Sequence, residues 1–229
     1  MLPTSTTNPS ATGANEAHEG SINPITPSKK VSKVVFVTVG ATASFRPLIE
    51  EVLSEKVLAK LAALRFTHLI VQCGPDLEYF ERVRPELQLP GEGDGKLQVS
   101  GFGYTRQMEH YMRLATAGTD DDNEDVKGER GEGLIITHAG SGSLLEALPL
   151  GTNIIAVPNT SLMGNHQAEI AIELEKDNYV IHGKIGQIDQ AIDGDKLKAL
   201  KKDWPGEEDP DSVFKGGLWE IINFLMPRD

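Results

Sequence analysis

Hydrophobic and polar positions alternate in blocks along this chain, and the blocks predict strands and helices that follow one another in turn. Short apolar runs predict strands at residues 34–39, 67–73, 96–100, 134–137, 153–157 and 179–182. Apolar residues three or four positions apart predict helices at residues 44–64, 105–116, 142–149, 165–176, 187–202 and 213–226. Alternating strands and helices are typical of a parallel sheet covered by helices on both faces. We therefore expect an α/β fold, a single Rossmann-like domain with a parallel sheet.

The same pattern changes at both ends of the chain and divides it into three parts. Residues 1–30 are rich in Ser, Thr, Asn, Pro and Gly, so we expect a disordered N-terminal tail without a signal sequence. Residues 31–202 should form the Rossmann-like domain, with an acidic insert at residues 118–132. Residues 203–229 should form an acidic linker and a C-terminal amphipathic helix.

The stretch from residue 134 to residue 174 is the most informative about function. It contains two predicted strands, each followed by a polar turn and a helix. The first turn runs from His138 to Ser143 and the second from Asn159 to Gly164. In open parallel sheets, ligands bind at the carboxyl ends of the strands. Because both turns follow strands, we expect them to face one pocket.

The residues of the first turn suit a phosphate ligand. Gly140 and Gly142 let the backbone approach a ligand closely. One of the neighbouring serines, 141 or 143, should cap the helix, whose free amides and dipole favour an anion. Glu146, expected in the first helical turn, can accept hydrogen bonds from sugar hydroxyls. A turn that only caps its helix would look the same, so the turn alone leaves both interpretations open.

A dinucleotide-binding motif and a catalytic serine motif are both excluded at this turn. A dinucleotide fingerprint requires a third small residue where Leu145 stands, and it requires an acidic residue further on that is missing here. A nucleophile elbow requires glycine two residues to either side of serine, and neither Ser141 nor Ser143 has them. An oxidoreductase and a serine hydrolase are therefore disfavoured.

Charge and cysteine content narrow the class of protein further. The formal net charge is −12, and residues 118–132 and 203–212 carry −5 each. The acidity thus belongs to two solvated segments, and no basic stripe indicates a nucleic-acid partner. The single Cys73 cannot form a disulfide within the chain and should pack as a small hydrophobe. No apolar run approaches the about 20 residues of a membrane span, so we expect a cytoplasmic protein.

Metal binding is not indicated. The six histidines are scattered, and His166 with Glu169 lacks the second histidine of a zinc-binding helix. Helix N-termini and backbone amides can neutralise an anionic ligand in place of a cation. We therefore expect no essential metal.

At this point the residues resemble a known family. The motif reads His-Ala-Gly-Ser-Gly-Ser-x-x-Glu from His138 to Glu146, followed by Gly151, Val157-Pro158 and Asn165-His166-Gln167-x-Glu169-x-Ala171. The opening strand and loop extend the match through Val34 to Gly40, Thr42 and Ser44-Phe45. The pattern is similar to the donor-binding C-terminal half of GT-B glycosyltransferases of the MurG type. It is most similar to the cytosolic subunit of eukaryotic UDP-N-acetylglucosamine (UDP-GlcNAc) transferases, from about Lys33 to the C-terminus.

The resemblance implies a role for each matching residue. The donor site would comprise Gly40, Thr42, His138, Gly140, Ser141, Gly142, Ser143, Glu146, Asn165 and Gln167. The glycines, the serines and Thr42 would lie against the diphosphate, and Glu146 would hold the ribose. Asn165 and Gln167 would bind hydroxyls of the transferred GlcNAc. The uracil would be bound by Phe102, Gly103 and Tyr104, partly through backbone. His138 has two interpretations, a ligand contact or an imidazole that braces the turn.

The resemblance also implies a split enzyme, because a GT-B enzyme has two such domains and this chain has room for one. The chain would bind UDP-GlcNAc as donor substrate, with no cofactor. A membrane-anchored acceptor-binding subunit would present GlcNAc-diphospho-dolichol at the cytosolic face of the endoplasmic reticulum. Transfer with inversion would be the second step of lipid-linked oligosaccharide assembly for N-glycosylation. No residue is singled out as the general base. The alternative is a non-catalytic nucleotide-sugar-binding or interaction module of the same fold.

The predicted C-terminal helix is a candidate for binding the partner subunit. Its candidate contact residues are Phe214, Leu218, Trp219, Ile222 and Leu225. Such a helix can also dock on its own domain. Aromatic residues are favoured anchors at protein interfaces, and the resemblance implies the same role for this segment.

Overall fold

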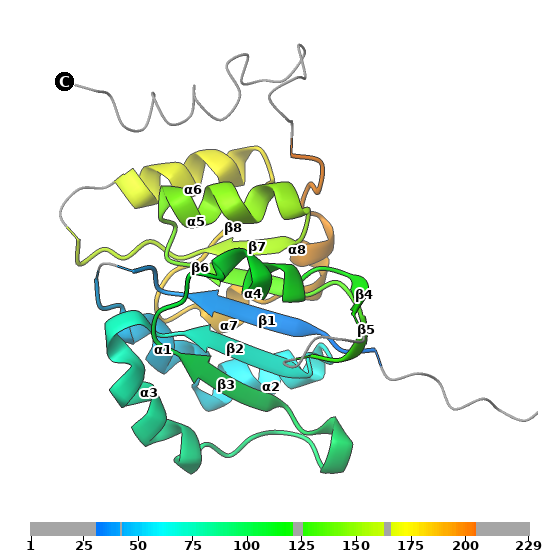
Figure 1. Cartoon of the computed structure of the whole chain (residues 1–229). Coiled ribbons are helices and arrows are strands. Elements are labelled where there is room, and N and C mark those ends of the chain that lie inside the picture. The colour runs from blue at the N-terminus through cyan, green and yellow to red at the C-terminus, as the bar shows by residue number, and fades with distance from the viewer. Residues whose placement is uncertain (1–30, 42, 121–125, 163–165, 205–229) are drawn as a thin grey trace, which may run out of the picture.

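The centre of the molecule is a parallel sheet of six strands, seen in a computed structural model that describes residues 31–204 except 42, 121–125 and 163–165 (Figure 1). The strands lie in the order β3-β2-β1-β6-β7-β8. Their bounds are β1 Val34–Thr38, β2 His68–Gln72, β3 Gln98–Phe102, β6 Leu134–Thr137, β7 Asn153–Ala156 and β8 Ile181–His182. If only these six strands are numbered along the chain, their order across the sheet is 3-2-1-4-5-6, which is the doubly wound Rossmann arrangement. The α/β fold expected from the sequence is confirmed.

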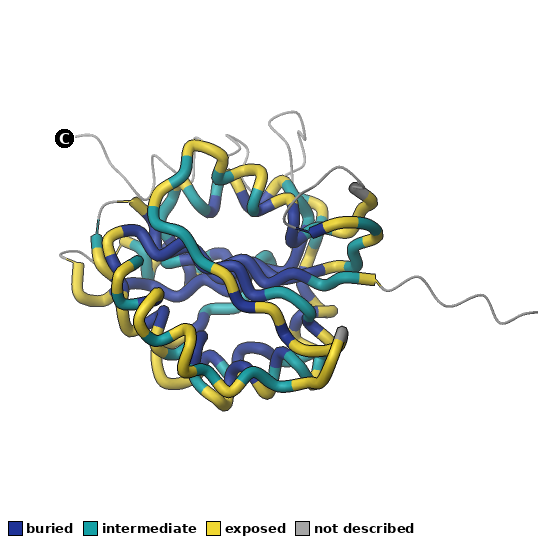
Figure 2. Tube along the Cα trace, turned by 60° about the horizontal axis from the view of Figure 1, so that its bottom comes forward, coloured by how far each residue is buried: buried dark blue, intermediate teal, exposed yellow. Residues whose placement is uncertain are grey.

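Helices cover both faces of the sheet, as the alternation of strands and helices predicts. The α-helices are α1 Arg46–Val52, α2 Glu55–Ala63, α3 Leu77–Val83, α4 Met108–Leu114, α5 Ser141–Ala147, α6 His166–Lys176, α7 Ile188–Ala191 and α8 Gly194–Lys198. Short 3-10 helices are η1 Gly74–Asp76, η2 Arg84–Glu86, η3 Gly93–Gly95 and η4 Leu148–Leu150. One layer of the core contains Val35 and Val37 of β1, and the other contains Val34 and Phe36. The four central strands β1, β2, β6 and β7 are therefore buried between two helical layers (Figure 2).

The structure corrects several boundaries expected from the sequence. Helix 44–64 is two helices: α1 ends at Val52, and Ser54 begins α2 as its N-cap, where its Oγ accepts a hydrogen bond from the Val57 amide. Helix 187–202 is likewise divided, since the Asp193 carboxylate accepts bonds from the amides of Asp195 and Lys196. Helix α3 was missed. The third strand starts at Gln98 and ends at Phe102, about two residues later than expected.

The acidic insert and the chain ends complete the picture. The insert contains a small antiparallel hairpin of β4 Gly118–Asp120 and β5 Gly128–Arg130, and Val126 beside it is buried. Near the last described residues, Lys202 forms an ion pair with Glu132 at 2.7 Å, and the Trp204 ring packs edge-on against Tyr179. The tail 1–30 and the helix expected at 213–226 lie outside the described residues.

Both outer edges of the sheet are occupied by a charged side chain. On the outer edge of β3, Arg84 Nε donates a hydrogen bond to the Val99 carbonyl at 3.0 Å. On the outer edge of β8, the His182 amide donates to the Glu175 carboxylate at 2.8 Å. These contacts satisfy backbone groups for which the sheet itself provides no partner.

In the described part of the chain, no helix is both long and apolar enough to cross a membrane.

Candidate functional site

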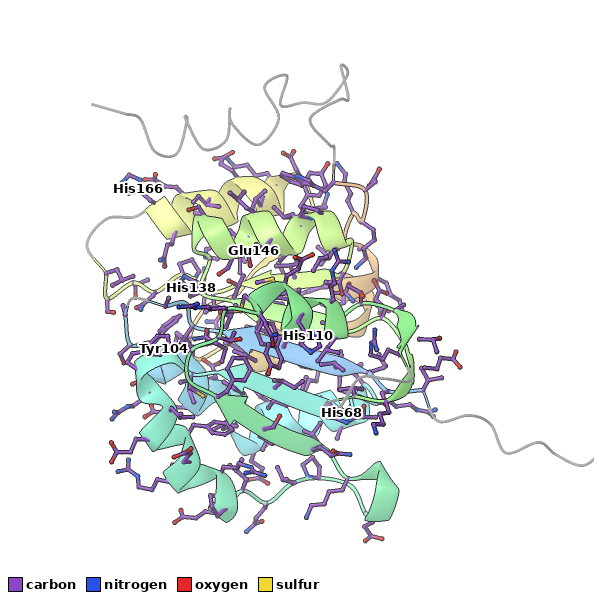
Figure 3. The ribbon with its side chains drawn as sticks, viewed as in Figure 1. His68, Tyr104, His110, His138, Glu146 and His166 are labelled. Atoms are coloured by element: carbon purple, nitrogen blue, oxygen red, sulfur yellow. The ribbon has the colours of Figure 1, made fainter. Side chains whose placement is uncertain are left out.

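Loops from across the chain meet at the carboxyl ends of the parallel strands. This edge of the sheet is distinct from the outer edges formed by β3 and β8. The loops after β1, β3, β6 and β7 all start there, and Figure 3 shows His138 and Tyr104 at this edge, with His68 at the opposite end. The two polar turns singled out in the sequence therefore start at one edge, and the pocket expected between them stays a prediction. Two other predicted site residues, Thr42 and Asn165, lie outside the described residues.

The His138 ring fills the space between the loop after β1 and the loop after β6. A Cβ atom added to Gly40 would lie 2.6 Å from His138 Cε1, and one added to Gly140 would overlap Nε2. Glycine is thus required at both positions because the imidazole occupies the place of a side chain. The His138 amide also donates to the Thr38 carbonyl at 3.1 Å, which joins the ends of β6 and β1. The ring braces the turn, one of the two interpretations that the sequence leaves open.

The environment of His138 favours its neutral form. Burial lowers the pKa of the imidazole below its ordinary value, and the Thr38 carbonyl offsets part of this shift. Its Nδ1 is buried without a hydrogen-bond partner. A neutral imidazole can donate from one nitrogen only, so it can offer a single hydrogen bond to a ligand or a loop.

Gly40 and Ala139, in the loops after β1 and β6, have left-handed backbone conformations. Gly40 has φ +82°, which glycine adopts without strain. Ala139 has φ +61° and is completely buried. A non-glycine residue in this region costs on the order of 1 kcal/mol and persists only where its surroundings hold it. Strain of this kind concentrates at functional sites, which supports the assignment of this edge.

Sequence reasoning missed Gln72, the residue with the most hydrogen bonds at this edge. It ends β2 and is 1% exposed. Its Oε1 accepts from the Thr38 hydroxyl at 2.7 Å and from the amides of Val39 and Gly40 at 3.1 and 3.2 Å. Its Nε2 donates to the carbonyls of Gly40 and Gly103, both at 3.0 Å. The signal in the sequence is a glutamine at the end of an otherwise apolar strand.

A second set of hydrogen bonds, also missed, joins the loop after β1 to the loop after β7. The buried Asp76 carboxylate accepts from the Ser44 hydroxyl at 2.8 Å and from the Phe45 amide at 3.0 Å. Asn159 Nδ2 donates to the Ser44 carbonyl at 3.1 Å. The Asn159 amide in turn donates to Gln167 Oε1 at 2.9 Å. Gln167, expected to bind the sugar, therefore also holds the loop before α6.

The start of α5 differs in detail from the expectation. The residue that caps it is Gly140, and neither Ser141 nor Ser143 provides a side-chain cap. Glu146 lies in the second turn of the helix instead of the first, and its side chain is exposed. The first amides of a helix have no partner within it, so those after Gly140 remain a feature suited to an anion.

The three residues expected to bind uracil differ in their surroundings. Phe102 belongs to β3, and its ring packs 4.3 Å from that of Tyr111 and 6.5 Å from that of Phe36. The Phe102 carbonyl accepts a hydrogen bond from the Cys73 amide at 2.7 Å. Gly103 lies in the loop with its carbonyl bound by Gln72, and Tyr104 is 63% exposed.

Two hollows described in the structure lie beside the outermost strands of the sheet, β8 and β3. One, of about 460 Å³, is lined by α6, β8, α7 and α8 residues, including His182 and Lys196. The other, of about 970 Å³, lies beside β2 and β3, between residues such as Ile70 and Leu89. Neither contains a predicted site residue. In the described ranges, no three His, Cys, Asp or Glu side chains are grouped so that they could hold a metal ion.

The fold and this edge match a known class of domain. The sequence profile of the glycosyltransferase family 28 C-terminal domain matches residues 34–117 and 130–199. The two matched segments include β1 to β3 and β6 to β8, and they omit most of the acidic insert.

Individual relatives narrow the family. The UDP-N-acetylglucosamine transferase subunit ALG13 of Saccharomyces cerevisiae is 34% identical over 169 residues, which cover 65% of this chain and 76% of that protein. The subunit of the same name from Cryptococcus neoformans is 31% identical over 206 residues, 85% of this chain and 97% of that protein. The Yarrowia lipolytica protein of this name is 34% identical, but the match spans 65% of this chain and 63% of that relative, less than two thirds.

A solved structure gives the same result. The NMR solution structure of ALG13 superposes with a TM-score of 0.52 at 29% identity, covering 79% of this chain and 92% of that one. The chain thus has the C-terminal domain of family 28 glycosyltransferases, and within that class it belongs to the ALG13 family of UDP-N-acetylglucosamine transferase subunits.

Proposed function

We propose that this chain is the donor-binding subunit of an inverting UDP-GlcNAc transferase whose acceptor site lies on a membrane-anchored partner. The observation that carries the proposal is the shared edge of the sheet, where the glycine-flanked His138 lies beside the start of α5, whose first amides have no side-chain cap. The relatives are named as subunits of UDP-N-acetylglucosamine transferases, which supports both the donor and the need for a partner. The acceptor would be GlcNAc-diphospho-dolichol at the cytosolic face of the endoplasmic reticulum.

The proposed site can stabilise a leaving UDP by electrostatics. As the acceptor oxygen attacks the anomeric carbon, negative charge grows on the diphosphate. Backbone amides and the dipole at the start of α5 are fixed in place before the reaction and favour that charge. The Glu146 carboxylate on the same helix would accept hydrogen bonds from the ribose, and Gln167 at the start of α6 would contact the GlcNAc.

The least exposed ionisable groups at this edge are poorly suited to deprotonate an acceptor. Burial, with a contribution from the Asp76 charge, raises the pKa of the Cys73 thiol to about 12, so it keeps its proton near neutral pH. The Asp76 carboxylate is engaged by Ser44 and Phe45. The His138 ring is wedged between Gly40 and Gly140. We therefore assign the general base of the proposed reaction to the partner subunit.

Two substitutions test the donor site by calorimetry with UDP and UDP-GlcNAc. Glu146→Ala should weaken both ligands alike, because it removes a charge-assisted hydrogen bond to ribose of about 1.5–3 kcal/mol, or about tenfold or more in Kd. Gln167→Ala should weaken UDP-GlcNAc more than UDP. Gln167→Glu keeps an acceptor for the Asn159 amide, so it separates support of the loop from the sugar contact. Equal losses for both ligands in the two Gln167 variants would refute the sugar assignment.

A transferase assay with labelled UDP-GlcNAc tests the division of labour. The purified chain should transfer no GlcNAc to a lipid acceptor alone and should gain activity with a membrane extract containing the partner. Full activity of the isolated chain would refute the split enzyme. Binding of UDP-GlcNAc without activity in any extract would favour a non-catalytic sensor.

A further inference from the structure

We propose that Gln72 is a positioning residue of the donor site, which holds the loops after β1 and β3 in place before a ligand arrives. The inference rests on the proposed function, because these two loops are where the diphosphate and the uracil are expected. Gln72 itself carries no predicted ligand contact.

The geometry assigns the two ends of the Gln72 amide to different tasks. Its oxygen faces three donors, the Thr38 hydroxyl and the amides of Val39 and Gly40. Its nitrogen faces two acceptors, the carbonyls of Gly40 and Gly103. Only this orientation of the amide satisfies all five contacts, since an amide oxygen accepts and an amide NH₂ donates. Both hydrogen atoms of the NH₂ group are used.

The consequence for Gly40 is a fixed peptide. Gln72 binds both its N–H and its C=O, and the residue has φ +82°, so rotation about its backbone bonds would break contacts on both sides. The His138 ring lies against the same glycine. Gly40 is thereby bound by the side-chain amide of Gln72 and packed against the imidazole of His138.

The contact with Gly103 links the loop after β1 to the loop after β3. Strand pairing does not provide this link, because β2 lies between β1 and β3. The Gly103 carbonyl accepts from Gln72 Nε2 and also from the Gly74 amide at 3.2 Å. Because one NH₂ group binds Gly40 and Gly103 together, the loop after β1 and the loop after β3 keep a constant separation. Preorganised polar groups lower the cost of ordering a site around its ligand.

A purely structural role is the competing explanation, because any buried amide stabilises a fold. Asn153 provides a matched control at the other end of the same sheet, where its Nδ2 donates to the Gly133 carbonyl at 2.9 Å and it is 6% exposed. Loss of either amide should lower stability. Only loss of Gln72 should alter the loops of the proposed site.

The experiment compares Gln72→Met, Gln72→Glu and Asn153→Leu in the full chain, by thermal unfolding, UDP calorimetry and amide hydrogen exchange. Gln72→Met, which keeps the volume and loses all five bonds, should raise the Kd for UDP at least tenfold and speed exchange at Gly40. Gln72→Glu keeps acceptor oxygens for Val39 and Gly40 but turns an oxygen toward the carbonyls of Gly40 and Gly103, so it should also raise the Kd for UDP and speed exchange at Gly40. Asn153→Leu should lower the melting temperature with the Kd for UDP within twofold of wild type.

The results that would refute the role of Gln72 differ from those that would refute the proposed function. Failure of the wild-type chain to bind UDP would refute the proposed function, and hydrogen exchange would still decide whether Gln72 holds Gly40. A folded Gln72→Met variant with wild-type UDP affinity and unchanged exchange at Gly40 would overturn the role of Gln72. Equal losses of affinity in Gln72→Met and Asn153→Leu would also overturn it, since the effect would then follow stability alone.

Discussion

Gly40 and Gly140 are far apart in the sequence, yet both are explained by the imidazole of His138. A side chain at either position would collide with this ring. The sequence pattern identifies Gly140, and the family resemblance implies Gly40, as a place where the backbone approaches a ligand, and the structure adds a neighbour from within the protein. A single histidine therefore determines how closely the loops after β1 and β6 can come together.

The buried His138 predicts a pH dependence of stability. Its pKa is lowered in the folded chain, while the unfolded chain should bind a proton near the ordinary value of 6.5. As pH falls below that value, the unfolded state takes up more protons than the folded state, so the free energy of unfolding decreases. The slope is at most about 1.4 kcal/mol per pH unit.

Urea unfolding at pH 7.5, 6.5 and 5.5 of the wild type and of His138→Asn tests this expectation. The variant should be less stable at every pH, because the ring no longer fills its place, and its stability should fall less steeply with acid. Parallel curves for the two proteins would show that His138 does not contribute to the pH dependence.

Single residues also show where sequence reasoning reaches its limit. The motif from His138 to Ser143 is contiguous, so its turn and its glycines could be recognised directly. Gln72, Asp76 and Asn159 come from three different segments, and each reads as an ordinary polar residue until the fold brings their partners within hydrogen-bond distance. The loop contacts at this edge could not be predicted because they depend on long-range geometry.

At the scale of elements, the strands were easier to locate than the helix ends. Buried parallel strands are continuous apolar runs, and five of the six expected runs overlap the observed strands with small shifts at the ends. The sixth, β8, retains only Ile181 and His182. Helices 44–64 and 187–202 were wrong because apolar spacing continues across Ser54 and Asp193, where side-chain caps begin a new helix.

One contact between elements yields a stability prediction. The Glu51 carboxylate of α1 accepts from the Gly186 amide at 2.6 Å and the Ile188 amide at 2.7 Å, so it caps the start of α7 from a distant helix. Glu51→Gln replaces one acceptor oxygen with a donor that faces an N–H group. We expect a loss of about 1–3 kcal/mol in the free energy of unfolding, measured in urea.

The exposed Glu92 supplies the matched control, since Glu92→Gln removes the same charge from the surface and should change stability by less than about 0.5 kcal/mol. UDP affinity should stay constant in both variants. Equal stability of the two variants would show that the Glu51 cap contributes nothing.

At the scale of the molecule, the described domain ends in a well-anchored segment. Lys202 is paired with Glu132, and Trp204 packs on Tyr179. The predicted helix at residues 213–226 follows these anchors in the sequence. A truncation after residue 212 therefore leaves every described contact of the domain intact.

We predict that this truncation abolishes co-sedimentation with partner-containing membranes and leaves the Kd for UDP unchanged. In the full chain, Leu218→Glu on the apolar face of the predicted helix should have the same effect. Asn223→Glu adds the same charge on the polar side and should retain binding. Truncated protein that still sediments with the membranes would place the partner contact elsewhere.

The side chains of Arg84 and Glu175 have a consequence for how this molecule joins others. A strand added to β3 would have to displace the Arg84 guanidinium from the Val99 carbonyl, and one added to β8 would have to displace the Glu175 carboxylate from the His182 amide. Edge strands whose backbone groups are already bound by side chains oppose both edge-to-edge aggregation and the binding of a partner by strand addition. Binding of the proposed partner subunit would therefore have to use side chains and loops in place of an added strand.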